Sequence, residues 1–155
     1  MPVISNPFDD ARLAKVRAEQ GDPIVQYYIV RKDIPMTIGK VCAQVAHGAQ
    51  IFAFYYASLK EGDHPIDTRL APVDIIEEWF NGSFRKVVLG GDAKDFEKVK
   101  KEIDVFVVRD AGLTEVEAGT ETLLVTWPML KSKQPKFLTK LQTLKRLEDD
   151  HVRRH

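Results

Sequence analysis

The sequence has very little cysteine, with a single residue of this type, Cys42, among 155. One thiol excludes an intramolecular disulfide and a cysteine-based zinc site, and it is typical of a reducing compartment. No apolar run approaches the roughly 18 residues of a membrane helix, and the N-terminus has no signal-peptide core. These absences predict a soluble cytoplasmic protein that makes no membrane contact.

The sequence also has no excess of either charge, since 23 Lys and Arg residues balance 23 Asp and Glu residues. A net charge of zero gives no global sign of a nucleic-acid partner, so an RNA-binding surface would have to come from local clustering. The motifs G-x-S-x-G, H-E-x-x-H and C-x-x-C are absent, so the common hydrolase and metal signatures do not apply. Gly90-Gly91 lacks a glycine-rich phosphate-binding fingerprint, and we expect Asp92 to cap a helix instead.

Strand and helix patterns alternate along the chain. Runs rich in β-branched and aromatic residues predict strands, and the first of them is apolar enough to be buried on both faces. The expected strands are 24–30, 86–90, 105–108 and 122–126. The expected helices are 7–20 capped by Asn6, 40–59, 72–80, 93–103 and a final one after Pro135, with an apolar stripe of Phe137, Leu138, Leu141, Leu144 and Leu147. This alternation predicts an α/β fold around a small mixed sheet.

The long helix carries three polar residues on one face, Lys40, Gln44 and His47, at positions i, i+4 and i+7. A lysine beside the free amides of a helix start suits an anion such as a phosphate or a developing oxyanion, although a solvated lysine is the alternative. Gln44 suits a half-buried polar edge as well as a ligand contact. His47 suits a general base or a hydrogen-bonded support. Cys42 lies off this face, and we expect it to be a small buried residue.

A second polar group follows the third strand. Asp110 and Thr114 come after an apolar run, and Thr122 begins the next strand, so an antiparallel return would bring all three to one end of the sheet. An aspartate can orient or activate water, and threonine hydroxyls can position it. The alternative is a hydrogen-bonded turn in which Asp110 satisfies local amides.

Two motifs in order resemble the archaeal and eukaryotic-type peptidyl-tRNA hydrolases. Residues 30–47 resemble the family's V-R-[ST]-D-L-x-M-x-x-G-K and the following helix K-x-A-A-Q-x-x-H-A, and residues 108–122 resemble V-R-D-A-G-x-T-x-[IV]-x-x-G-[ST]-x-T. The likeness covers about 24–128. We therefore divide the chain into an N-terminal helical extension at 1–22, a central domain at 23–128 and a C-terminal helical extension at 129–155 that packs on it.

The resemblance implies hydrolysis of the ester between peptide and tRNA, with no metal and no cofactor. It also implies a four-stranded mixed sheet with helices on both faces, in three α/β/α layers, and a protein that is often a homodimer. Carried over by position, the catalytic residues would be Lys40, Asp110, Thr114 and Thr122. The substrate-binding residues would be Gln44, His47, Arg31 and Gly112.

Several positions depart from the family pattern and leave a second function open. Leu113 and Glu115 stand where Arg or Lys and Gln are common, and Lys32, Ile38 and Glu117-Ala118 also differ. These changes remove cations and add acids near the expected RNA-facing edge, and phosphate contacts require cations. The basic residues after position 128 would restore an RNA surface or form a solvated face. The alternatives are a non-catalytic binding module with the same fold and a hydrolase of a related small ester or amide.

Overall fold

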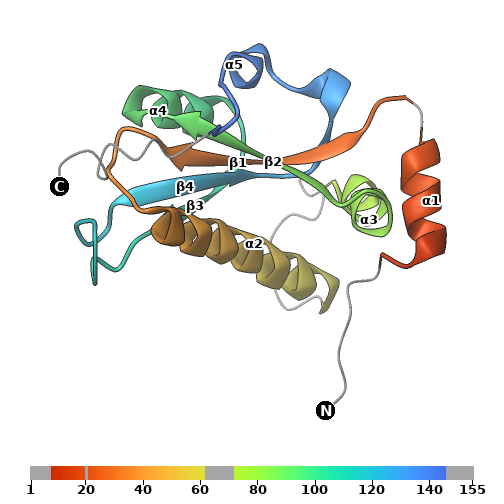
Figure 1. Cartoon of the computed structure of the whole chain (residues 1–155), viewed down its shortest axis with the longest axis horizontal. Helices are drawn as coiled ribbons and strands as arrows, with labels where there is room; N and C mark the ends of the chain where they lie inside the picture. Colours follow the sequence, from red (N-terminus) through yellow and green to blue (C-terminus); the bar gives the residue numbers. More distant parts are fainter. Residues whose placement is uncertain (1–7, 20, 62–71, 146–155) are drawn as a thin grey trace.

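The computed structural model describes residues 8–19, 21–61 and 72–145. Its centre is a mixed sheet with the strand order β2-β1-β4-β3, and a short fifth strand also pairs with β1 (Figure 1). β1 is parallel to β2 and antiparallel to β4, and β3 is antiparallel to β4. The strands are β1 (Ile24–Arg31), β2 (Arg85–Gly91), β3 (Val105–Arg109), β4 (Glu121–Thr126) and β5 (Met129–Leu130).

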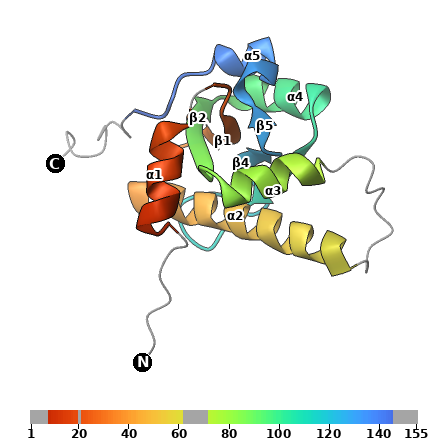
Figure 2. The same ribbon diagram turned by 90° about the vertical axis from the view of Figure 1, so that its right-hand side faces the viewer.

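Helices cover both faces of this sheet. They are α1 (Asp10–Ala18), α2 (Ile38–Glu61), α3 (Val73–Asn81), α4 (Ala93–Glu102) and α5 (Lys136–Thr139). Helices α4 and α5 lie on one side, and α2 and α3 lie on the other (Figures 1 and 2). The predicted three-layer α/β/α fold is thus confirmed, with the two-residue β5 in addition to the four expected strands. Across the described ranges, no helix combines the length and the apolar character needed to span a bilayer.

Strand β1 is the centre of the core, as its continuous apolar sequence predicted. Every residue from 24 to 30 is buried. Alternate side chains point to opposite faces of a strand. Tyr27 and Ile29 therefore pack in the cluster that contains α4 and α5, while Tyr28 and Val30 pack in the cluster beneath α2.

Helix α2 lies close to the sheet at Gly48, which is buried against β4. The prediction that Cys42 is buried is wrong, since its side chain is exposed. The buried face of α2 runs through Val41, Gln44, Gly48 and Phe52. Successive helical residues are about 100° apart, so the neighbour of Val41 points toward solvent.

The helix expected after Pro135 begins there, but in the described part of the chain it is much shorter than predicted. Helix α5 makes a single turn, and the chain then runs beside β2, where Gly90 donates its N–H to the carbonyl of Gln142 at 3.0 Å and Leu144 donates to that of Val88 at 3.0 Å. This sheet edge offers backbone partners that compete with the helix. The apolar residues expected on a helical stripe pack on the sheet instead, namely Phe137, Leu138, Leu141 and Leu144. Leu147 lies outside the described residues.

Helix α1 begins later than predicted and is fixed to α3. Its cap is Asp9, which accepts the backbone N–H of Arg12 at 2.8 Å, whereas Asn6 lies outside the described residues. The Arg12 guanidinium donates to the carbonyl of Gly82 at 3.0 and 2.8 Å and to that of Phe80. These are carbonyls at the end of α3, where a cation is favoured by the helix dipole and by unpaired acceptors.

Candidate active site

The sheet brings the two predicted polar groups together. Strand β3 ends at Arg109, and the chain returns at Glu121 as the antiparallel β4, as predicted. The intervening loop is closed by two backbone bonds: Asp110 donates to the carbonyl of Thr120 at 2.9 Å, and Gly119 donates to that of Asp110 at 2.7 Å. Gly112 has a φ of +76°, and a Cβ there would lie 2.4 Å from the backbone nitrogen of Ala118, so only glycine fits.

Asp110 is the most highly connected residue of the site. Its Oδ1 lies 2.6 Å from Lys40 Nζ and accepts from Gln44 Nε2 at 3.1 Å, while its Oδ2 accepts the N–H of Gly112 at 2.8 Å. The hydrogen bonds from Lys40 and then from Gly112 hold the pKa of the Asp110 carboxyl below its usual value of 3.8. Asp110 therefore stays ionised at neutral pH. Asp110 accepts a local amide, as the turn interpretation predicted, and it also pairs with Lys40, which the sequence did not predict.

Lys40 links α2 to the loop. Besides Asp110, its Nζ donates to Thr114 Oγ1 at 3.0 Å. The Lys40 side chain is 13% exposed and that of Asp110 is 7% exposed, so the ion pair is shielded but still reachable from solvent. Charged groups interact more strongly in such a partly dry site than in bulk water.

Gln44 and Thr122 form the buried floor of the site. Thr122 is fully buried and donates its hydroxyl to Gln44 Oε1 at 2.5 Å. This bond orients the Gln44 amide so that its Nε2 faces Asp110. Thr122 is thus linked to Asp110 through hydrogen bonds to Gln44, and it lies behind the Lys40–Asp110 ion pair.

A pocket of about 470 Å³ opens in front of the ion pair. Lys40, Asp110 and Thr114 line it, and so does His47, whose side chain is exposed. Among the described residues, the His47 imidazole has no hydrogen-bond partner, so it is placed to meet a ligand more directly than to support the fold.

Arg31 does not join this group. Its guanidinium pairs with Asp33 at 2.7 and 3.0 Å and lies over the ring of Phe96, 5.3 Å from its centroid. Phe96 belongs to α4, on the opposite face of the sheet from α2. The pocket in front of Lys40 is therefore formed without Arg31.

The start of α2 holds an acid that sequence reasoning did not place there. Thr37 donates its backbone N–H to the Glu115 carboxylate at 2.8 Å and its hydroxyl to the same carboxylate at 2.6 Å. Thr37 also begins the helix, since its carbonyl accepts the N–H of Val41 at 3.0 Å. The sequence predicted that the positive end of the helix dipole would bind an anion such as a phosphate. In the structure this end of the helix faces the carboxylate of Glu115.

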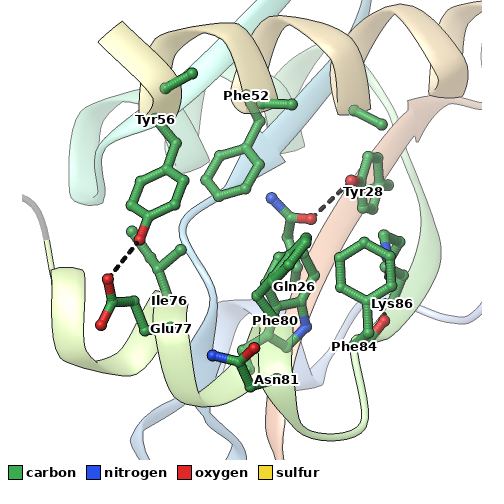
Figure 3. Close-up of a pocket in the computed structure, with 14 residues that line it drawn as sticks. Gln26, Tyr28, Phe52, Tyr56, Ile76, Glu77, Phe80, Asn81, Phe84 and Lys86 are labelled. Carbon is green, nitrogen blue, oxygen red and sulfur yellow. Dashed lines mark hydrogen bonds between the residues drawn. The ribbon is translucent and has the colours of Figure 1, made fainter. Parts of the chain in front are cut away.

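A second pocket of about 550 Å³ lies between α2 and α3, and Figure 3 shows its lining. Two of its polar side chains bond within the protein: Tyr28 donates to Gln26 Oε1 at 2.7 Å, and Gln26 donates to the carbonyl of Thr126 at 3.1 Å. Burial lowers the pKa of Lys86 to about 8, with Nζ 2.9 Å from the centroid of the Phe84 ring. None of the predicted site residues lines this pocket, so the candidate active site is the one at Asp110.

Fold and site together define a small three-layer α/β protein with a shielded lysine–aspartate pair at the end of its sheet. Comparison with known families extends this description. The chain belongs to the family described as Peptidyl-tRNA hydrolase PTH2, whose model matches residues 24–144. The match includes every residue of the site and excludes α1.

Curated relatives agree with this assignment. A peptidyl-tRNA hydrolase of Methanopyrus kandleri is 39% identical over 111 residues, covering 66% of this chain and 83% of that protein. One from Staphylothermus marinus is 37% identical over 109 residues, covering 66% and 80%. One from Thermoplasma acidophilum is 31% identical over 121 residues, covering 74% and 93%.

Proposed function

We propose that this protein hydrolyses the ester that joins a peptide to the terminal ribose of tRNA, releasing the peptide and a reusable tRNA. The observation that carries this proposal is the shielded Lys40–Asp110 pair, with 2.6 Å between Nζ and Oδ1, at the wall of an open pocket in a member of this family. The reaction requires an attacking water, a group that stabilises the oxyanion, and a group that orients the water and the stabilising group.

The geometry supports a distinct role for each residue. Water attacks the ester carbonyl, and we expect the Lys40 ammonium and the Thr114 hydroxyl, which bond to each other, to stabilise the developing oxyanion. Asp110 holds Lys40 in place, and its lowered pKa makes it a weak base. His47 lines the same pocket and is our candidate for accepting the proton from water and giving it to the ribose oxygen when the ester bond breaks. Gln44, Gly112 and Thr122 position Asp110.

Hydrolysis of an N-acetyl-aminoacyl-tRNA by the purified protein tests this function. We expect release of the acylated amino acid into the acid-soluble fraction, with little release from the same tRNA carrying an unblocked amino acid. Hydrolysis of p-nitrophenyl acetate alone would support the small-ester alternative. No release from any blocked aminoacyl-tRNA would contradict the proposal.

We also propose that the protein acts in the cytoplasm as a homodimer, as the resemblance to its family implies. The chain has a mass of 17.6 kDa, so a dimer has about twice this mass. Sedimentation equilibrium at micromolar concentration distinguishes the monomer from the homodimer. A single species at the monomer mass would contradict the proposed dimer.

Glu115 should weaken tRNA binding, because its carboxylate adds negative charge at the expected RNA-facing edge. Glu115→Gln keeps the shape and an acceptor for Thr37 but removes the charge. We expect the KM for the tRNA substrate to fall by about two- to fivefold at low salt, in line with roughly 0.3–1 kcal/mol for a charge at a helix end. The gain should shrink at high salt because exposed charges are screened.

Glu117→Gln is the matched control, since Glu117 is an exposed acid of the same loop that accepts the Thr120 hydroxyl through its backbone carbonyl, not through its carboxylate. It should change the KM less than Glu115→Gln does. A KM that is unchanged or higher in Glu115→Gln would show that Glu115 does not oppose the RNA.

A further inference from the structure

The exposed apolar side chains of this protein are concentrated at the candidate active site. Among the described residues, three of the five large hydrophobic side chains that are exposed line the Asp110 pocket: Ile51 at 41%, Phe54 at 74% and Leu113 at 87% exposed. Single exposed apolar residues are ordinary on a protein surface, but a group of them around one pocket marks a contact surface. We call Ile51, Phe54 and Leu113 the apolar wall.

The apolar wall continues the catalytic face of α2. Lys40, His47, Ile51 and Phe54 are spaced seven, four and three residues apart, which places them along one side of the helix. At about 1.5 Å per residue, Ile51 lies roughly 16 Å along the axis from Lys40. Leu113 reaches the same pocket from the loop after β3. The pocket therefore has a charged end, where the reaction would occur, and an apolar end.

An edge of the sheet also lines the pocket. Val108 and Arg109, the last residues of β3, line it, and β3 pairs only with β4 among the described strands. An edge strand presents backbone N–H and C=O groups on its outer side. An extended chain in the pocket would thus meet both apolar side chains and main-chain groups. In peptides bound along a strand edge, the main-chain bonds give affinity and the side-chain contacts give specificity.

The chemistry of this apolar end favours the peptide over the RNA. Phosphates are bound by cations, whereas the wall is apolar, and Arg109 nearby already lies 3.6 Å from Glu121. We propose that the pocket holds the peptide end of the substrate, with the side chain next to the ester packed on Leu113, the neighbour of Thr114, and the rest of the peptide running along the β3 edge and over Ile51 and Phe54. This inference rests on the proposed hydrolase function and adds a preference for apolar residues at the ester.

The preference is measurable as a ratio of kcat/KM values on one tRNA body that carries different blocked amino acids. We expect N-acetyl-leucyl-tRNA to be hydrolysed about tenfold or more faster than N-acetyl-aspartyl-tRNA, which is the scale of discrimination by a small apolar surface. The double variant Phe54→Ser, Leu113→Ser should reduce this ratio to about twofold or less. It should reduce hydrolysis of N-acetyl-leucyl-tRNA more than that of N-acetyl-glycyl-tRNA, because glycine has no side chain to bind.

Phe80→Ser is the matched control. Phe80 is also an exposed aromatic residue, 50% exposed, but it belongs to α3 and does not line the Asp110 pocket. It should leave the leucine-to-aspartate ratio unchanged. Circular dichroism checks that the variants remain folded, which is expected because the substituted side chains are exposed.

The outcomes separate this inference from the proposed function. Equal hydrolysis of the leucyl and aspartyl substrates would overturn the inference and leave the hydrolase function intact. Equal losses on all three substrates in the double variant would also overturn it, since the wall would then serve the terminal base of the tRNA or the fold. No hydrolysis of any of them by the unmodified protein would instead contradict the proposed function.

Discussion

Asp110→Asn is expected to lower kcat/KM for a blocked aminoacyl-tRNA by about a thousandfold while the protein stays folded. The amide keeps the volume of the side chain and an acceptor for the N–H of Gly112. It removes the charge that lies 2.6 Å from Lys40, and its NH2 group would then face the donors of both Lys40 and Gln44. Lys40 then loses the orientation that places its ammonium in front of the pocket.

Lys40→Met should cause a loss of similar size, because it removes the cation and keeps most of the aliphatic stem. Asp104→Asn and Lys94→Met are matched controls, since both residues are exposed and neither lines the pocket. They should retain full activity. More than a tenth of the original activity in Asp110→Asn would show that the ion pair is not central to the reaction.

The dependence of activity on pH in the unmodified protein also tests the role of Asp110. The pKa of Asp110 lies below its usual value of 3.8, so its carboxylate is ionised throughout the neutral range. Any stability that the ionised carboxylate contributes is present above its unfolded-state pKa and is lost as the pH falls through the lower folded-state value. Titration of Asp110 should therefore cause no rise or fall of activity between pH 5 and 8. A change of activity in this range would come from the titration of another group.

The sequence predicted the features that depend on residues close together in the chain. Asp92 caps α4 as expected, with a reciprocal capping box to Asp95, because this bonding involves residues three apart. The face shared by Lys40, Gln44 and His47 follows from helical spacing alone, and the structure places all three at the site. The antiparallel return after Asp110 followed from a short loop between two apolar runs.

Features that depend on distant partners were not predictable. The bonds from Thr37 to Glu115 and from Thr122 to Gln44 each join residues 78 positions apart, and no local pattern reports such a pair. The tail after Pro135 has apolar residues at helical spacing, but its backbone pairs with β2, and spacing does not reveal an open sheet edge. Cys42 was misplaced because one small residue does not define which side of a helix faces the core.

Gly48→Ala is expected to destabilise the protein by about 3 kcal/mol, although alanine favours a helix over glycine by about 1 kcal/mol. A Cβ at Gly48 would lie 2.5 Å from Leu123 Cδ2 and 2.6 Å from Val125 Cγ2. Both of these side chains are fully buried, so they cannot move toward solvent to relieve the clash. Overpacking therefore exceeds the gain in helix propensity. For a chain of this size the midpoint of thermal unfolding should fall by roughly 6–12 °C.

Gly39→Ala separates the two effects, because it makes the same chemical change in the same helix without the clash. A Cβ at Gly39 meets only Thr37 Oγ1, at 4.0 Å, so this variant should be as stable as the original protein or slightly more stable. Equal melting temperatures for the two variants would contradict the close packing of α2 on β4. The site gives a second readout, since Gln44 on α2 binds Thr122 on β4 across the same contact. An α2 displaced at Gly48 would lengthen that bond, so Gly48→Ala should also lower hydrolysis at temperatures where the protein is still folded.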